Sequence, residues 1–239
     1  MSPRVEYVLF DLDGLLIDSE AIYTAVTNEI LAPYGCEMTW EIKAGLMGKN
    51  EQAAAAHLFA ALPPIALTPE AYLVQRRGLQ DQRWPRVQLL PGAAKLIAHL
   101  HSHGIPMAIA TGSNRAEFKL KTAHLSVTFG VFGENVVCAD DPRMYGRKSK
   151  PAPDVFLQAA QLLGRGEGEG SKGLVFEDAI PGVQAAVAAG MNVVWIPDPR
   201  LQQVAGADTT PVVPPETRRL ASLEDFKPEE YGLPPYSAP

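Results

Sequence analysis

The sequence is poor in cysteine and in long apolar runs, and these shortages exclude several classes of protein. Two cysteines, Cys36 and Cys138, occur among 239 residues, which is too few for the disulfide framework of a secreted protein, so we expect a reducing, cytoplasmic location. No apolar run approaches the ~18–20 residues of a membrane-spanning helix. The first apolar stretch is soon broken by Asp11 and Asp13, which argues against a secretory signal. We therefore expect no membrane partner.

Positive charge is also scarce. The chain has 21 Lys and Arg against 27 Asp and Glu, a formal net charge of −6. Nucleic acids and anionic membranes are bound by clustered Lys and Arg, which this chain does not show, so we expect no nucleic-acid partner. A net charge of −6 would also make an anionic substrate unexpected, because like charges repel. The hydrophobic content of 46% is ordinary for a globular protein, and the length suits one large domain or two small ones.

Four short apolar runs end in small or acidic residues, as buried strands do when they reach a functional edge. They cover residues 5–10, 105–110, 173–176 and 192–196. Segments with the apolar spacing of a helix lie before, between and after the last three of these apolar runs. This alternation predicts an α/β fold: a Rossmann-like parallel sheet with helices on both faces. The proline-rich tail beyond residue 210, with Pro211, Pro214, Pro215, Pro234, Pro235 and Pro239, indicates a surface wrap or a loose end.

The alternation is interrupted once, directly after the first predicted strand. Residues 20–91 contain no convincing strand but show helical patterns around Ile22 to Ile30, Ala53 to Leu62 and Pro69 to Trp84. We therefore expect a sheet domain formed by residues 1–18 and 91–239, and an inserted helical cap formed by residues 19–90. Asp18 is predicted to cap the first helix of this insertion.

The residues that follow the predicted strands carry the chemistry, because ligands bind at the carboxyl ends of parallel strands. These residues are Asp11, Asp13, Thr111, Gly112, Ser113, Glu177 and Asp178. Four carboxylates at one edge repel each other unless a cation holds them, and carboxylate and main-chain oxygens are ligands that Mg²⁺ prefers. The sequence therefore predicts a Mg²⁺ site.

An anion site is predicted beside the metal. Thr111 and the amides after it stand at a strand-to-helix junction, where free N–H groups favour phosphate, although Thr111 could also cap the helix. Lys150, from the loop before residue 154, adds a point positive charge. Carboxylates, metal, anion site and lysine together describe phosphoryl transfer, in which one aspartate is the nucleophile and another protonates the leaving oxygen. Spacing alone does not decide which of Asp11 and Asp13 has which role.

The chain resembles the haloacid-dehalogenase superfamily of phosphatases in four ordered motifs. These are Asp11-Leu12-Asp13-Gly14 with its continuation to Ser19, Thr111-Gly112-Ser113, Lys150-Pro151-Ala152-Pro153-Asp154 and Phe176-Glu177-Asp178-Ala179. The resemblance implies that Asp11 is the nucleophile and a metal ligand, and that Asp13 is the general acid/base and binds the metal through its main-chain carbonyl. It further implies that Thr111, Gly112 and Lys150 hold the phosphate, that Asp178 binds Mg²⁺, and that Glu177 supports it directly or through water.

The resemblance extends to the insertion. A helical cap at this point is similar to that of β-phosphoglucomutase and small-metabolite phosphatases, and segments such as 23–26, 46–49 and 90–93 most resemble the pseudouridine-5′-phosphatases and their relatives. This implies hydrolysis of a small phosphorylated metabolite. Because a cap of this type suffices in a monomer, we expect a monomer by default. Lys49 would reach over the substrate when the cap closes, or is a surface lysine at a helix start. The basic loop 143–149 leaves open whether Lys148 or Lys150 binds phosphate, and the adjoining Pro-Ala-Pro-Asp favours Lys150.

Three other functions fit part of this pattern. A phosphomutase of the β-phosphoglucomutase type would use the same residues but return the phosphoryl group to the sugar. A phosphoacceptor module like a bacterial receiver domain would also place acids, a threonine and a lysine at strand ends, but it would lack the insertion. A non-catalytic phosphometabolite-binding protein would keep the motifs without turnover.

Overall fold

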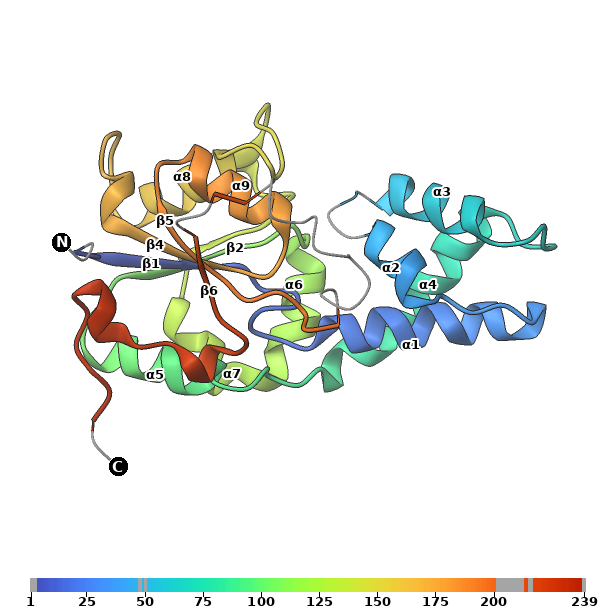
Figure 1. Ribbon diagram of the computed structural model, residues 1–239, viewed down its shortest axis with the longest axis horizontal. Coiled ribbons are helices and arrows are strands. Elements are labelled where there is room, and N and C mark those ends of the chain that lie inside the picture. Colours follow the sequence, from blue (N-terminus) through green and yellow to red (C-terminus); the bar gives the residue numbers. More distant parts are fainter. Residues whose placement is uncertain (1–3, 47–48, 50, 201–212, 215–216, 238–239) are drawn as a thin grey trace.

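The described residues form one parallel sheet of six strands. The computed structural model describes residues 4–46, 49, 51–200, 213–214 and 217–237. The strand order is β3-β2-β1-β4-β5-β6, and every pair of neighbours is parallel (Figure 1). The strands are β1 (Tyr7–Phe10), β2 (Met107–Ala110), β3 (Val136–Val137), β4 (Gly173–Glu177), β5 (Asn192–Trp195) and β6 (Arg218–Arg219).

Helices cover both faces of the sheet, because successive strand residues bury opposite sides. In β1, Val8 and Phe10 belong to one apolar cluster, whereas Tyr7 and Leu9 belong to another. The first cluster is shared with α5 (Ala93–Ser102) and α7 (Ser126–Phe129), which lie on one side of the sheet in Figure 1. The second is shared with α8 (Asp154–Leu162) and α9 (Ile180–Ala188) on the other side. The two-sided sheet expected from the sequence is confirmed.

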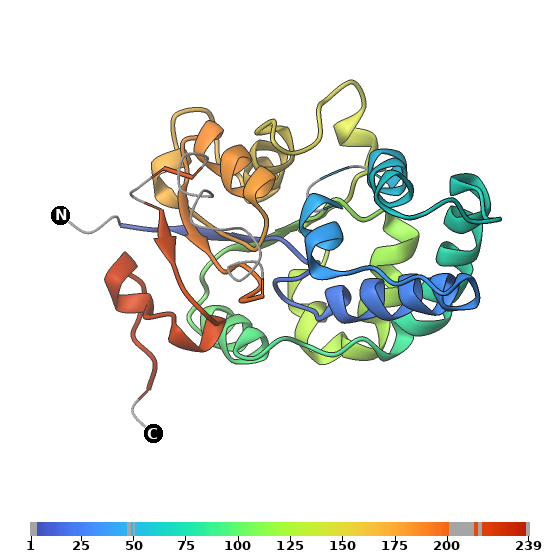
Figure 2. The same cartoon turned by 45° about the vertical axis from the view of Figure 1, so that its right-hand side comes forward.

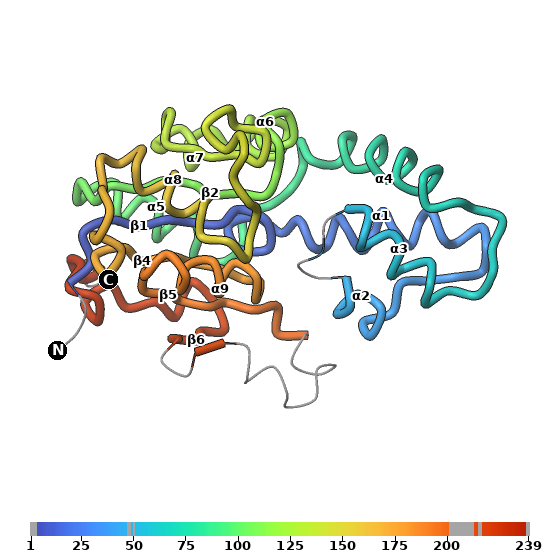
Figure 3. Tube along the Cα trace, turned by 90° about the horizontal axis from the view of Figure 1, so that it is seen from above, coloured from blue at the N-terminus to red at the C-terminus, as the bar shows by residue number. Residues whose placement is uncertain are grey.

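A helical insertion lies in the chain between β1 and α5. Its helices are α1 (Ser19–Leu31), α2 (Trp40–Leu46), α3 (Glu51–Ala61) and α4 (Pro69–Arg83). They enclose an apolar cluster of their own, which contains Val26, Leu31, Leu58 and Tyr72. Figures 2 and 3 show this bundle beside the sheet rather than on either of its faces. Asp18 caps α1 as predicted, since its carboxylate accepts a hydrogen bond from the Ala21 amide at 3.2 Å.

Three elements had no sequence signal strong enough to predict them. Strands β3 and β6 have two residues each, and so short a segment shows no periodicity. Helix α2 has seven residues and buries Lys43, so no apolar stripe marks it. No helix in the described part of the chain combines the length and the apolar character needed to cross a bilayer.

The described part of the tail corrects the expectation of a surface wrap or a loose end. Residues 217–237 supply β6 and four buried apolar side chains of the first cluster: Leu223, Phe226, Tyr231 and Leu233. Phe226 packs edge-on against Phe176 of β4, with ring centroids 4.8 Å apart. The tail therefore completes the core over one face of the sheet. Pro211, Pro215 and Pro239 lie outside the described residues.

The chain reverses its direction of winding across the sheet at β1. After β1 it builds β2 and β3 on one side, and then crosses to β4, β5 and β6 on the other. In such sheets the carboxyl ends of the strands at the reversal form the ligand crevice. The site is therefore expected where β1, β2 and β4 end.

The burial of Phe226 gives a test of the tail's role in the core. Phe226→Ala is expected to lower the free energy of unfolding by about 3–5 kcal/mol, because it removes a buried ring and leaves a cavity. Chemical denaturation measures this change. Tyr145→Ala, at a ring that is 95% exposed, is the control and should change stability by less than about 0.5 kcal/mol. Equal effects of the two changes would contradict the assignment of the tail to the core.

Candidate active site

A half-buried ammonium group joins two carboxylates where β1 and β4 end. Lys150 Nζ lies 2.5 Å from Asp11 Oδ1 and 2.6 Å from Glu177 Oε1, and it also donates to the Ala110 carbonyl at 3.1 Å. The Asp11 residue is 7% exposed and Glu177 is 1% exposed. Burial would lower the pKa of Lys150, but the two carboxylates raise it above its ordinary value. A permanent positive charge therefore stands beside Asp11, whereas Lys148 is exposed.

Glu177 is fixed from two sides. Its Oε2 accepts hydrogen bonds from the amides of Asp178 and Ala179, each at 3.0 Å, while Oε1 accepts from Lys150. Helix α9 approaches so closely at Gly182 that a Cβ atom there would collide with this carboxylate. Both carboxylate oxygens of Glu177 therefore have hydrogen-bond partners. Glu177, fixed in this way, holds Lys150 in place.

Asp11 carries a strongly perturbed carboxyl group. Burial raises its pKa to about 7, although the Lys150 ammonium lowers it and the charges of Glu177 and Asp13 raise it further. A group poised near neutrality in a polar crevice is a common mark of a functional residue. Asp11 directly follows β1, so its carboxylate lies where the strand order of the sheet reverses.

Asp13 has the opposite environment. Its Oδ1 accepts from Lys121 Nζ at 2.7 Å, and its Oδ2 accepts from the Ser113 hydroxyl at 2.7 Å. Burial alone would raise the pKa of Asp13, but the Lys121 ammonium and these hydrogen bonds hold it below its ordinary value. Two aspartates separated by one residue thus have pKa values shifted in opposite directions, as expected for groups with different chemical roles.

Lys121 is the site residue that the sequence reasoning missed. Its side chain is fully buried, donates to the Ser113 hydroxyl at 2.8 Å and the Tyr23 hydroxyl at 3.2 Å, and lies 4.3 Å from the centroid of the Trp84 ring. It lies on α6 (Arg115–Thr122), three residues after the partly buried Phe118. Residues three apart lie on the same face of a helix, so this spacing places Lys121 on the face that packs inward. A lysine on an inward face was the sequence feature that could have identified it.

Thr111, Gly112 and Ser113 lie together between β2 and α6. Thr111 is buried, and its hydroxyl accepts the Ser113 amide at 3.0 Å, which leaves the hydroxyl hydrogen free to donate. Gly112 is exposed. Asn114, rather than Thr111, caps α6 by accepting the Glu117 amide at 2.9 Å. The threonine is therefore available for an anion.

Asp178 has the electrostatic character of a cation ligand. Burial, together with the negative charges of Glu177, Asp11 and Glu20, holds its pKa well above the ordinary value. Among the described residues none donates a hydrogen bond to its carboxylate. Gly14, with φ of +76°, passes so close to Oδ2 that a side chain there would collide with it. A cation between Asp178 and Asp11 would relieve this repulsion.

The donor set fits Mg²⁺ rather than a metal held wholly by side chains. Within the described ranges no group of three or more His, Cys, Asp or Glu side chains is arranged around a common metal position. Mg²⁺ does not require such a group, because it is usually held by one or two carboxylates, water and a substrate phosphate. The carboxylates of Asp11 and Asp178 and a main-chain carbonyl would suffice.

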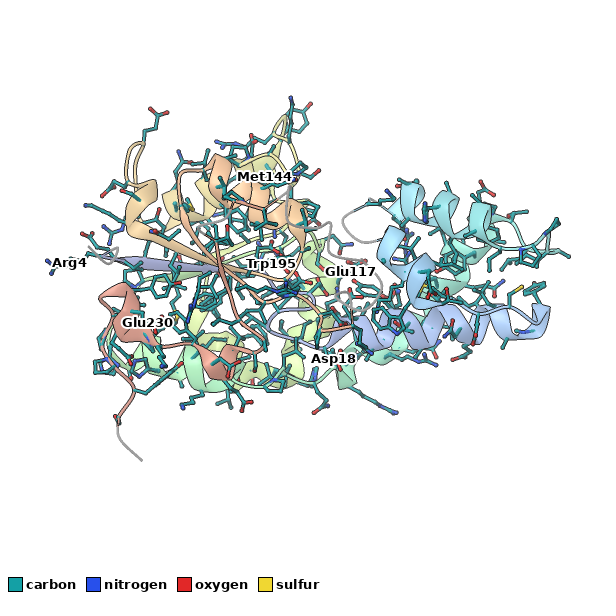
Figure 4. All side chains as sticks on the ribbon, in the orientation of Figure 1. Arg4, Asp18, Glu117, Met144, Trp195 and Glu230 are labelled. Atoms are coloured by element: carbon teal, nitrogen blue, oxygen red, sulfur yellow. The ribbon has the colours of Figure 1, made fainter. Side chains whose placement is uncertain are left out.

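A cavity of about 440 Å³ opens from Asp13 toward the helical insertion. The sheet domain contributes Asp13, Gly112, Ser113 and Glu117, and the insertion contributes residues that include Lys49 and Arg76. In Figure 4, Glu117 lies on the side of the sheet domain that faces the insertion, far from Arg4 and Glu230. Lys49 is exposed at this cavity. The sheet domain and the insertion therefore both supply walls of this cavity.

The chain has extensive similarity to known hydrolases. The profile of the haloacid dehalogenase-like hydrolase family matches residues 5–190. The chain is 42% identical over 234 residues to (DL)-glycerol-3-phosphatase 2 of Arabidopsis thaliana, an alignment that covers 97% of this chain and 93% of that protein. It is 40% identical over 234 residues to a probable pseudouridine-5′-phosphatase of Drosophila melanogaster, covering 98% and 96%.

A solved structure has the same fold. The structure of a HAD family hydrolase from Deinococcus radiodurans R1, with bound phosphate and sodium, superposes with a TM-score of 0.74 at 27% identity. The superposition covers 99% of this chain and 100% of that one. The similarity therefore includes both the sheet and the insertion.

The environment of Asp11 predicts how its carboxyl group titrates. In metal-free protein, the ¹³C carboxyl signal of Asp11 is expected to titrate with a midpoint of about 7. An aspartate in the unfolded chain has a pKa of ~3.9. Between that pH and about 7 the folded protein therefore binds one proton more than the unfolded chain. The stability that Asp11 contributes through this proton is lost as the pH rises through about 7. Lys150→Met should raise the midpoint further, because the ammonium group lowers it. A midpoint below about 5 would contradict the environment described.

Proposed function

The chain belongs to the haloacid dehalogenase-like hydrolases, and from this premise we propose that it is a Mg²⁺-dependent phosphatase that works through an aspartyl-phosphate. It is a phosphoric monoester hydrolase of small phosphorylated metabolites, like its named relatives. The observation that supports the aspartyl-phosphate mechanism is that the pKa of Asp11 is raised and that of Asp13 is lowered, where the strand order of the sheet reverses.

Asp11 is the nucleophile in this proposal. One of its carboxylate oxygens attacks phosphorus, an acyl-phosphate bond forms, and the bond from phosphorus to the leaving alcohol breaks. Lys150, 2.5 Å from Asp11 Oδ1, holds the carboxylate in position and offsets the negative charge of the incoming phosphate. The Thr111 hydroxyl and the Gly112 amide bind the phosphate oxygens, while the Ser113 amide donates to the Thr111 hydroxyl and holds it in position.

Asp13 is the general acid and then the general base. It gives a proton to the leaving oxygen in the first step, and in the second it takes a proton from the water that attacks the aspartyl-phosphate, which releases phosphate and restores Asp11. Its low pKa while bound to Lys121 and Ser113 suits the base. The negative charge of a bound phosphate raises the pKa of a nearby carboxyl group, so substrate binding favours the acid form that the first step needs.

The metal would be held by the carboxylates of Asp11 and Asp178 and the main-chain carbonyl of Asp13. When bound, Mg²⁺ neutralises carboxylate and phosphate charge and orients the phosphate for in-line attack. Glu177 takes part through Lys150, because both of its oxygens are already occupied.

The helical insertion, residues 19–90, is the cap over a sheet domain formed by residues 1–18 and 91–239. Closure of the cap would exclude bulk water during the first step and would bring Lys49 over the substrate. The relatives named for glycerol 3-phosphate and pseudouridine 5′-phosphate support a small monoester as the substrate. Because one chain supplies both sides of the cavity, a monomer suffices. Both cysteines are free, which suits a reducing, cytoplasmic setting.

The role of Asp11 is tested by Asp11→Asn. This change is expected to reduce phosphate release by at least about 10³-fold, because the amide is a far weaker nucleophile. The matched control is Asp18→Asn in the same loop, where asparagine can still cap α1 and activity should be retained. Release of free phosphate is followed by ³¹P NMR, so that a mutase would be recognised by an isomerised sugar phosphate. Equal release by wild type and Asp11→Asn would remove Asp11 from the mechanism.

The metal proposal predicts a pH-dependent affinity. Chelation should abolish activity and added Mg²⁺ should restore it, with an apparent affinity that rises as the pH is raised from about 6 to 8. The apparent Mg²⁺ affinity rises with pH because Asp11 must lose its proton to bind the metal, and the pKa of Asp11 is about 7 without the metal. Asp178→Asn should weaken Mg²⁺ binding by at least about tenfold. Full activity in the chelated enzyme would refute the metal requirement.

A further inference from the structure

The cavity between the sheet domain and the insertion contains an open pair of opposite charges. Arg76 on α4 and Glu51 at the start of α3 both line it. Arg76 Nη2 lies 4.0 Å from Glu51 Oε1, which is too far for a hydrogen bond. Arg76 Nε is buried and has no hydrogen-bond partner among the described residues. A buried donor without a partner is costly, so the Arg76 guanidinium keeps hydrogen-bonding capacity that a group entering the cavity can use.

Both members of this pair are held in position. Glu51 Oε2 accepts a hydrogen bond from Arg77 Nη2 at 3.2 Å, which leaves Oε1 turned to Arg76. The Arg76 guanidinium carbon lies 5.8 Å from the centroid of the Tyr23 ring. The two groups therefore present a donor and an acceptor on opposite sides of one gap, with both orientations set by neighbours.

The other polar groups of the insertion that line the cavity are largely satisfied. Lys43 bonds to Thr24 Oγ1 at 2.7 Å and forms an ion pair with Glu20 at 2.9 Å. The hydroxyls of Thr27 and Tyr72 bond to each other at 2.9 Å. Among the described residues of this wall, Arg76 and Glu51 thus form an open donor and acceptor pair, beside the exposed ammonium group of Lys49.

The charge of the pair indicates what fits between them. A hydroxyl group both accepts and donates, so it can accept from Arg76 and donate to Glu51 at the same time. A carboxylate or a second phosphate could accept from Arg76 but would be repelled by Glu51, and an alkyl group would leave both unpaired. The surroundings therefore favour an uncharged, hydroxylated group.

We propose that Arg76 and Glu51 select the leaving alcohol of the substrate, and that this alcohol is uncharged and carries free hydroxyl groups. The inference rests on the proposed phosphatase activity and adds the substrate class. Sugar, polyol and nucleoside monophosphates satisfy it, whereas phosphorylated carboxylic acids and bisphosphates do not.

Three phosphate esters of equal carbon number test the selection. Wild-type enzyme is expected to hydrolyse glycerol 3-phosphate with a kcat/KM at least about tenfold above that for n-propyl phosphate, which lacks the hydroxyls, and above that for 3-phosphoglycerate, which adds a carboxylate. Uridine 5′-phosphate and its 2′,3′-dideoxy counterpart form a second pair with a larger alcohol. If neither pair shows a preference for the hydroxylated ester, the proposal is wrong.

Variants assign the preference to these two residues. In Arg76→Met, the ratio of kcat/KM for glycerol 3-phosphate over n-propyl phosphate should fall at least about fivefold, because the donor is lost. In Glu51→Gln, kcat/KM for 3-phosphoglycerate relative to glycerol 3-phosphate should rise at least about fivefold, because the repulsion is removed. Arg83→Gln is the matched control on α4, where Arg83 pairs with Glu29 outside the cavity, and both ratios should stay within about twofold of wild type.

The outcomes separate this proposal from the one on which it rests. Unchanged ratios in both Arg76→Met and Glu51→Gln would overturn the selection while leaving the phosphatase intact. Each ratio is taken within one variant, so a loss of overall activity does not imitate the effect, and Glu51→Gln remains informative if Arg76→Met does not fold. Absence of phosphate release from every ester in wild type would instead overturn the phosphatase proposal.

Discussion

The bridge from Lys150 to Asp11 and Glu177 is the interaction on which the rest of the site depends. Parallel strands bring their carboxyl ends to one edge, and in this chain that edge carries buried acids that repel each other. Lys150 offsets part of that repulsion, and Glu177 is in turn fixed by two backbone amides and by the close approach of α9 at Gly182. The net negative charge of the chain therefore says little about the field that a phosphate group meets.

A second lysine, the buried Lys121, gives the site its asymmetry. Lys121 pairs with Asp13 as Lys150 pairs with Asp11. At Asp11, however, burial raises the pKa more than Lys150 lowers it, and the charge of Glu177 adds to the rise, whereas the pKa of Asp13 is lowered. Lys121 also contacts Tyr23 of α1 and the Trp84 ring that follows α4. Both contacts lie where the insertion joins the sheet domain, so the position of the insertion and the environment of Asp13 are physically connected.

Much of the fold followed from the sequence, because short apolar runs that end in acids are a strong signal of parallel strands. The structure brings Asp11, Lys150 and Glu177 into contact. The sequence placed the two acids at the ends of separate strands and the lysine on a loop beside them. Contacts that depend on tertiary packing were not accessible in this way. Lys121 lies 108 residues from Asp13, and the Arg76–Glu51 gap requires two helices to be placed side by side. The two-residue strands and the buried tail likewise acquire their form from neighbours rather than from local pattern.

The central claim is that Asp11 becomes phosphorylated during turnover. The most direct measurement is acid quenching of the enzyme during hydrolysis of a phosphate ester, followed by borohydride reduction and peptide mass spectrometry, which converts an aspartyl-phosphate to homoserine. We expect homoserine at position 11 and an unmodified Asp13. Reduction at Asp13 or at another residue, with Asp11 intact in enzyme that turns over, would contradict it.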